Sequence, residues 1–143
     1  MDKTPNDPSV PGAQAVDDIS GLHRSRAGEI IAAAIEVHRE LGPGLLESAY
    51  QAAMCRELSL RRTEFIQQVD MPLSYKGVNL DCGYRIDLIV DNTVVVELKA
   101  VQEILPVHEA QLLTYLRLTG MRVGLLINFN VAVLKDGIRR KIL

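Results

Sequence analysis

The stretch that decides the fold is Arg85-Ile86-Asp87-Leu88-Ile89-Val90-Asp91-Asn92-Thr93-Val94-Val95-Val96-Glu97-Leu98-Lys99. Two runs of Val, Ile and Leu flank the pair Asp91-Asn92, a pattern typical of a buried β-hairpin. Glu97 and Lys99 lie two residues apart, so they share one face of their strand. Charged side chains on a largely buried sheet are unfavourable unless they are paired or bind an ion. Together with Asp87, this pair therefore predicts a site for a divalent cation and an anionic ligand such as phosphate.

The alternative is an exposed edge strand that carries an ordinary ion pair. Such a strand should alternate polar and apolar residues, whereas three valines in succession, residues 94–96, lead into the charges. A shared ion also sets the register of the hairpin. Asp87 and Glu97 face each other only if the turn centres on Asn92 with a loop of odd length, because a two-residue Asn92-Thr93 loop would place them on opposite faces. We predict the odd loop or a compensating bulge.

Composition sets the outer limits on structure and partners. With 143 residues, 48% of them hydrophobic and 24% charged, the chain is suited to one soluble globular domain. A net charge of -2 argues against a protein that coats nucleic acid electrostatically, so any such contact must be local. Cys55 and Cys82 form neither a metal-ligand spacing nor a disulfide framework, which predicts reduced thiols. We see no targeting signal or membrane-length apolar run, and we therefore expect a cytoplasmic protein.

The order of predicted elements gives the fold class. Residues 1–20, which are rich in Pro and polar residues, are expected to form a flexible tail before a domain over residues 21–143. Hydrophobic period and turn residues predict helices and strands in an order typical of an α/β sandwich, with a mixed β-sheet flanked by helices. Strand 123–128 is apolar throughout and should be central, and parallel to a neighbour. The predicted helices are 22–41, 45–60 and 107–119, and the other strands are 65–69, 71–75, 78–80, the two arms of the quoted hairpin, and a closing hairpin of 131–134 and 138–143.

Two further groups of residues bear on chemistry, and each has a simpler explanation. His108, Gln111 and Tyr115 lie on one stripe of the third helix, which suits either a site or a solvated face with a buried Tyr. Glu47 lies in the first turn of the second helix, where the helix dipole alone favours a negative charge. Tyr50, one turn further on, is expected to pack in the core.

At these residues the chain resembles a known family. The stretch Gly44-Leu45-Leu46-Glu47-Ser48-Ala49-Tyr50 matches the signature of the GxxExxY family, and the segments 110–116 and 126–129 are similar to it as well. The likeness covers about residues 28–143. That family resembles the PD-(D/E)XK, restriction-endonuclease-like nuclease superfamily, which implies a restriction-endonuclease-like fold. Ile86 departs from the superfamily pattern, which would place Pro there, and nothing in the chain resembles the helicase or specificity domain of many relatives.

The resemblance implies a set of catalytic residues and a cofactor. Mg²⁺ or Mn²⁺ would be held by Asp87, Glu97 and the main-chain carbonyl of Leu98, with Glu47 completing the shell through water or binding a second ion. The other members would position the attacking water and the phosphate. The six implied catalytic residues are Glu47, Asp87, Glu97, Lys99, Gln111 and Tyr115.

The implied activity is a Mg²⁺-dependent phosphodiesterase that cleaves nucleic acid, with DNA expected over RNA. The alternatives are a catalytically silent module that binds nucleic acid or protein on the same fold, and a hydrolase of another phosphoester. The intact Asp, Glu and Lys argue against the silent module. A homodimer and an unknown protein partner both stay open. Two basic clusters are either contacts for a nucleic-acid backbone or ordinary solvated surface, and they comprise Arg56, Arg61, Arg62, Arg139, Arg140 and Lys141.

Overall fold

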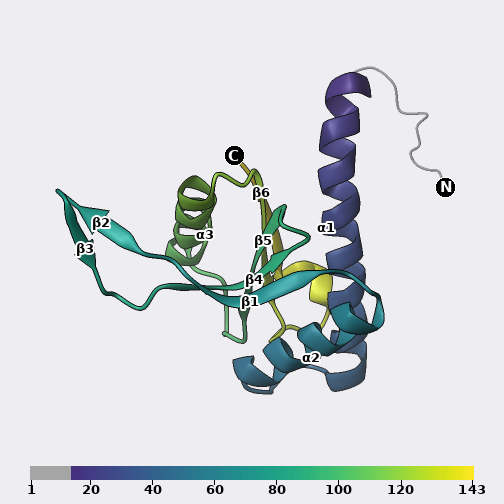
Figure 1. Cartoon of the computed structure of the whole chain (residues 1–143). Coiled ribbons are helices and arrows are strands. Elements are labelled where there is room, and N and C mark those ends of the chain that lie inside the picture. The colour runs from purple at the N-terminus through teal and green to yellow at the C-terminus, as the bar shows by residue number, and fades with distance from the viewer. Residues whose placement is uncertain (1–13) are drawn as a thin grey trace.

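The computed structural model describes residues 14–143, with side chains from Arg26 onward. Its centre is a five-stranded mixed sheet in the order β1-β4-β5-β6-β7, in which β5 and β6 are parallel and the other neighbours are antiparallel (Figure 1). A separate two-stranded sheet pairs β2 with β3. The elements are α1 (Gln14–Leu41), α2 (Glu47–Leu60), β1 (Phe65–Asp70), β2 (Leu73–Tyr75), β3 (Val78–Leu80), β4 (Arg85–Val90), β5 (Val94–Lys99), α3 (Pro106–Thr119), β6 (Val123–Asn128), the 3-10 turn η1 (Leu134–Gly137) and β7 (Ile138–Ile142).

Helices cover both faces of the sheet, as the predicted α/β sandwich requires. The first two helices pack on one face, where Leu88, Val96 and Leu125 belong to the larger buried cluster. The third helix packs on the other face through a second cluster that includes Val95 and Leu126. Every residue of β6 is buried, and this strand lies between β5 and β7, parallel to β5. The prediction of a central parallel strand is therefore confirmed.

The β4–β5 hairpin has the register that a shared ion requires. Leu88 pairs with Val96 and Val90 with Val94, so the turn centres on Asn92 with a three-residue loop. Asp91 and Asn92 adopt φ of 52° and 54°, in the left-handed region that Asx residues tolerate better than most. The predicted odd-length loop is confirmed.

The side chains of β1 and β4 switch from one face of the sheet to the other at one point, and the backbone pairing of the two strands is interrupted there. Phe65 packs in the cluster of the first two helices, whereas Val69, which regular alternation would place on the same face, packs in the cluster of the third. On the partner strand Leu88 and Ile86 divide in the same way. Between these positions Gln68 adopts a φ of 51°, and its pairing with β4 is interrupted. Backbone pairing between β4 and β5 begins at Leu88, so Asp87 lies just beyond the end of this ladder.

The first helix is longer than predicted. Helix α1 begins at Gln14, eight residues before the predicted start. Residues 1–13 of the expected tail lie outside the described residues, and the domain boundary at residue 20 stays a prediction. Within residues 14–143 no helix combines the length and the apolar composition needed to cross a membrane.

The predicted strand 131–134 is wrong. β7 instead pairs with the free edge of β6, where Ile138 lies opposite Ile127. The connecting segment forms a 3-10 turn whose first residue, Leu134, is buried against the α1–α2 side of the sheet. A Cβ on Gly137 would lie 2.1 Å from the carbonyl oxygen of Asn128, so only glycine allows this close approach. Local β-propensity at residues 131–134 is overridden by the stronger pairing that an open strand edge offers.

Candidate active site

All six predicted catalytic side chains line one open cleft. Its volume is about 360 Å³, and it lies where strands β4 and β5 separate, between the start of α2 and one side of α3. Two helices and the two strands of one hairpin therefore supply the predicted set. The residues that line the cleft are Glu47, Gln68, Gly83, Tyr84, Arg85, Asp87, Glu97, Lys99, Gln111 and Tyr115.

Asp87 and Glu97 hold each other's strands through main-chain contacts. The Asp87 N–H donates to Glu97 Oε2 at 2.9 Å, and the Leu98 N–H donates to Asp87 Oδ2 at 2.8 Å. The two carboxylates thus take the place of the hydrogen bonds that the ladder lacks beyond Leu88. Because they are bound to strands rather than to a loop, their positions are set by the sheet. Gln68 also donates from its amide to Asp87 Oδ1, at 3.4 Å.

The electrostatics of the cleft are unfavourable for its own carboxylates. Glu97 is 4% exposed, and burial, assisted by the charge of Asp87, raises its pKa to about 8. Burial also raises the pKa of Asp87, although the Leu98 amide, Gln68 and Lys99 oppose that rise. At the rim, partial burial raises the pKa of Glu47, and the charge of Asp87 adds to the effect. Three acidic groups with raised pKa values in one cleft are typical of a functional site.

The loop before α2 fixes the position of Glu47. Tyr50 is fully buried and stacks on Phe129 with ring centroids 4.5 Å apart, which confirms its predicted core role. Its hydroxyl donates to the carbonyl oxygen of Gly42 at 2.5 Å and accepts from the N–H of Leu45 at 3.2 Å. The tyrosine of the sequence signature therefore holds the turn from which the helix starts. Glu47, one helical turn earlier, is brought to the cleft by that anchor.

The opposite wall is built by α3. The Gln111 amide donates to the Tyr115 hydroxyl at 3.1 Å, which leaves the phenolic proton free to donate into the cleft. Burial raises the pKa of Tyr115 to about 12, and the nearby charges of Glu97 and Asp87 add to this, so the group stays protonated at neutral pH. His108 does not join the cleft. Its Nδ1 accepts the Leu105 N–H at 2.9 Å and closes the first turn of the helix.

Sequence reasoning missed several residues that support this site. Gln51 donates to the main-chain carbonyl of Asp87 at 3.1 Å. Asn128, 1% exposed, donates to the Val101 carbonyl and accepts its N–H, which ties down the segment after Lys99. For Asn128 the sequence did contain a signal, since an asparagine ends an otherwise apolar strand that is expected to be buried. For Gln51 no comparable pattern exists, because a glutamine on a helix surface is common.

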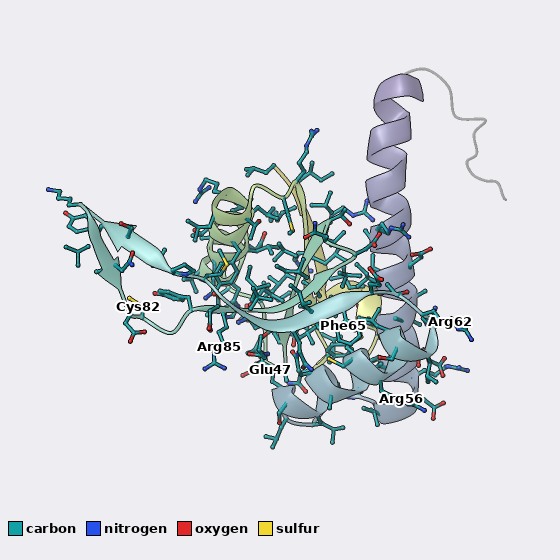
Figure 2. The ribbon with its side chains drawn as sticks, in the orientation of Figure 1. Glu47, Arg56, Arg62, Phe65, Cys82 and Arg85 are labelled. Atoms are coloured by element: carbon teal, nitrogen blue, oxygen red, sulfur yellow. The ribbon has the colours of Figure 1, made fainter. Side chains whose placement is uncertain are left out.

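The basic residues of the two predicted clusters lie away from the cleft. Figure 2 shows Arg56 and Arg62 toward the opposite end of α2 from Glu47. Lys141 pairs with Glu109 at 2.5 Å. Apart from Lys99, the basic side chain that lines the cleft is Arg85, which sequence reasoning had not singled out.

The described residues contain no ready-made cluster of three His, Cys, Asp or Glu side chains for a metal ion. The geometry explains this, since Asp87 and Glu97 are each turned toward a main-chain amide. The side chain of Leu98 is buried on the α1–α2 side, and ligation by its carbonyl stays a prediction.

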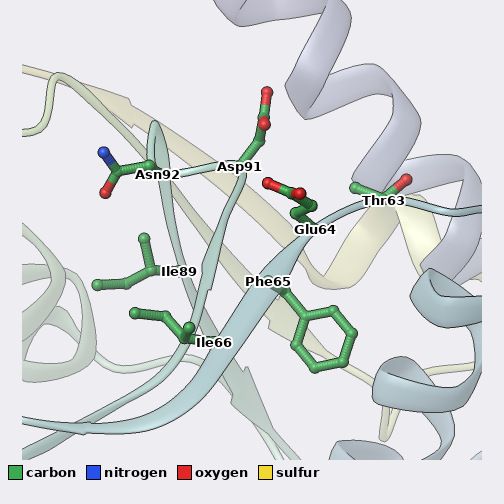
Figure 3. Close-up of a pocket in the computed structure, with 7 residues that line it drawn as sticks. All are labelled: Thr63, Glu64, Phe65, Ile66, Ile89, Asp91 and Asn92. Carbon is green, nitrogen blue, oxygen red and sulfur yellow. The ribbon is translucent and has the colours of Figure 1, made fainter.

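A second hollow, of about 530 Å³, lies at the other end of the same hairpin and includes none of the predicted catalytic residues (Figure 3). Glu64 and Asp91 line it together with apolar side chains such as Ile66 and Ile89. Asp91 forms an ion pair with Arg26 at 2.5 Å. Asp91 at this end thus has a cationic partner.

Comparison with known proteins agrees with this geometry. The family model described as the PD-(D/E)XK nuclease superfamily matches residues 24–141. The match covers the whole cleft and every strand of the sheet except the last residue of β7. Neither the curated proteins nor the solved structures gave a significant match. With its mixed sheet flanked by helices and a family match over most of its length, the chain belongs to the PD-(D/E)XK nuclease superfamily.

Proposed function

We propose that this protein is a divalent-metal-dependent nuclease that hydrolyses phosphodiester bonds of nucleic acid, with DNA as the first substrate to test. One observation carries the proposal. Six residues from four separate elements line one cleft, and one of its buried members, Glu97, is an acid whose carboxylate the fold disfavours. A structural role alone does not account for a buried glutamate and a half-buried aspartate beside a lysine, because burying such charges is unfavourable.

The donor set fits a small, hard cation. Within residues 26–143 neither Asp87 nor Glu97 forms an ion pair with a basic side chain. Carboxylate oxygens are the ligands that Mg²⁺ and Mn²⁺ prefer. Asp87 and Glu97 would hold the ion, with the Leu98 carbonyl as a third ligand and Glu47 at the rim. When bound, the ion supplies a water of lowered pKa and neutralises charge on phosphate oxygens.

The remaining residues have roles that follow from their chemistry. Lys99 shares a strand face with Glu97 and would place its positive charge beside the phosphate as negative charge develops there. Tyr115, with its hydroxyl oxygen occupied by Gln111, would donate its proton to a non-bridging phosphate oxygen. Arg85 lines the cleft and would bind a flanking phosphate. Together these groups orient the substrate and stabilise its charge.

The test is a cleavage assay on single-stranded and double-stranded DNA and RNA, linear and circular, with Mg²⁺, Mn²⁺ or EDTA. We expect cleavage that needs a divalent metal and that EDTA abolishes. Circular substrates separate internal cleavage from cleavage at an end. If the wild-type protein binds nucleic acid but shows no EDTA-sensitive cleavage of any form, the nuclease proposal is withdrawn in favour of a binding module.

A further inference from the structure

The hairpin formed by β2 and β3 extends away from the sheet as an arm (Figure 1). Its register pairs Leu73 with Leu80 and Tyr75 with Val78, and these four residues share one face. The opposite face carries the polar pair Ser74 and Asn79. Tyr75 and Val78 are 61% and 60% exposed. Leu73, at the base of the arm, lines a groove together with residues of α3, whereas Tyr75 and Val78 flank the turn of the hairpin and lie outside that groove.

An apolar groove of about 460 Å³ runs between the base of this arm and α3. The helix contributes Val107 and Leu118, which are 64% and 44% exposed. No Asp, Glu, Lys or Arg lines the groove. Its complete lining is Leu73, Tyr84, Val107, His108, Ala110, Gln111, Thr114, Tyr115 and Leu118.

The groove is continuous with the catalytic cleft. Tyr84, Gln111 and Tyr115 line both of them. Tyr84 is 43% exposed, and its carbonyl accepts the N–H of Met71, which closes the base of the arm. Whatever occupies the groove therefore lies directly beside the group bound in the cleft. On one side of these three shared residues the lining carries charged side chains, and on the other side it carries none.

We propose that the groove binds an unpaired nucleobase next to the scissile phosphodiester, an inference that rests on the proposed function. A nucleobase is flat, uncharged and covalently attached to the phosphate, which matches an uncharged groove that continues from a phosphate site. Tyr84 offers an aromatic surface for stacking. His108 offers a hydrogen-bond donor, because its Nδ1 accepts from Leu105 and the neutral ring then carries its proton on Nε2.

The substrate class follows from the shape of this occupant. Bases inside a duplex are stacked and paired, so they enter such a groove only after unstacking, which is unfavourable. Single strands, flaps and frayed ends present bases without that penalty. The groove therefore selects single-stranded or locally unpaired nucleic acid over continuous duplex.

The test measures binding separately from cleavage. Wild-type protein in EDTA is titrated into three labelled DNA ligands of equal length: a single strand, a single-stranded backbone that lacks every base, and a duplex. The abasic ligand keeps the phosphates, so it isolates the contribution of the bases. We expect the normal single strand to bind roughly tenfold tighter than the abasic strand, as expected for one stacked base.

Matched variants assign the effect to the groove. In Tyr84→Ala and Leu118→Ser the normal and abasic strands should differ by less than about threefold, as expected when stacking is lost. Tyr75→Ala removes an exposed tyrosine from the same arm outside the groove lining, and it should keep the wild-type difference. Circular dichroism checks that each variant is folded.

Three results would overturn the inference. The first is equal affinity of wild type for the normal and the abasic strand. The second is an equal loss of the affinity difference in Tyr75→Ala and Tyr84→Ala. The third is conversion of a dimer to a monomer by Leu118→Ser in light scattering, which would make the groove a subunit contact. The cleavage assay separates this failure from failure of the proposed function. Metal-dependent cleavage without base dependence removes only the groove assignment, whereas absence of cleavage of every nucleic acid form removes both.

Discussion

The two ends of the β4–β5 hairpin both carry acidic residues, but in contrasting surroundings. At the turn, Asp91 pairs with Arg26, and Glu64 is exposed. At the open end, Asp87 and Glu97 are directed to main-chain amides and have no cationic partner that forms an ion pair within residues 26–143. The comparison shows that acidity alone does not mark a site. Burial of carboxylates without a counter-charge does, because the charged form then carries a free-energy cost that a bound cation or a proton relieves.

The largest expected effect comes from the same substitution made at each end. Asp87→Asn keeps size and leaves an oxygen for the Leu98 amide, but it removes the charge that would bind a metal. We expect cleavage to fall by at least about a thousandfold, as expected on loss of a metal ligand. Asp91→Asn, the matched change at the turn, should stay within about twofold of wild type, because exposed ion pairs contribute little. Similar activity in both variants would contradict the assignment.

A smaller loss is expected when the charge beside the carboxylates is removed. Lys99→Ala leaves Asp87 and Glu97 in place, so metal binding should persist while turnover falls by roughly a hundredfold, as expected for a group that acts on the transition state. Isothermal titration with Mn²⁺ measures binding, and single-turnover cleavage measures the chemistry. Lys76→Ala, on the exposed arm, is the control. Loss of metal binding in Lys99→Ala would instead assign the lysine a structural role.

The pH dependence of stability provides a third contrast. The pKa of Glu97 is about 8 in the folded protein, above its ordinary value of 4.5, so its contribution to stability is complete below 4.5 and is lost as the pH rises through 8. Metal-free wild type should therefore lose stability relative to Glu97→Gln between pH 5 and pH 8. Since a pKa difference of one is worth about 1.4 kcal/mol, we expect a loss of roughly 2 kcal/mol after allowing for relaxation around the site.

Urea unfolding in EDTA at the two pH values measures this difference. Glu64→Gln, the exposed counterpart at the other end, should follow the wild-type profile. A parallel pH profile for wild type and Glu97→Gln would show that Glu97 is solvated rather than buried.

The sequence predicted the parts of this site that depend on period and spacing. The apolar runs around Asn92 predicted the two strands, and the requirement that Asp87 and Glu97 share one face predicted the odd loop. The hydrophobic period predicted the helix that carries Glu47, and the resemblance at residues 44–50 implied the role of that residue. The structure adds the reason for the tyrosine of the signature, which anchors the turn through Gly42. The roles of the six residues stay predictions until activity is measured.

Other features were beyond reach because they depend on contacts between distant elements. Glutamine does not by itself indicate a left-handed conformation, yet Gln68 adopts one where β1 and β4 change faces. The segment 71–80 shows the same alternation whether its strands join the sheet or leave it as an arm. Residues 131–134 have strand propensity but lose the available edge to β7. In each case tertiary pairing decided between locally acceptable structures.

The smallest expected effect concerns Glu47, which lies at the rim and has the weakest claim to be a ligand. A cation that binds the folded protein raises its melting temperature by an amount that grows with concentration, and at ten times the dissociation constant the gain is about 1.4 kcal/mol, or roughly 4 °C for a domain of this size. Wild type should show this rise with Mg²⁺ or Mn²⁺ at pH 8 relative to EDTA. Glu47→Gln should reduce the rise at each concentration, since one carboxylate is lost, while Glu64→Gln should keep it. If Glu47→Gln matches wild type over the whole titration, Glu47 only favours the start of α2 through the helix dipole, and the site consists of Asp87 and Glu97.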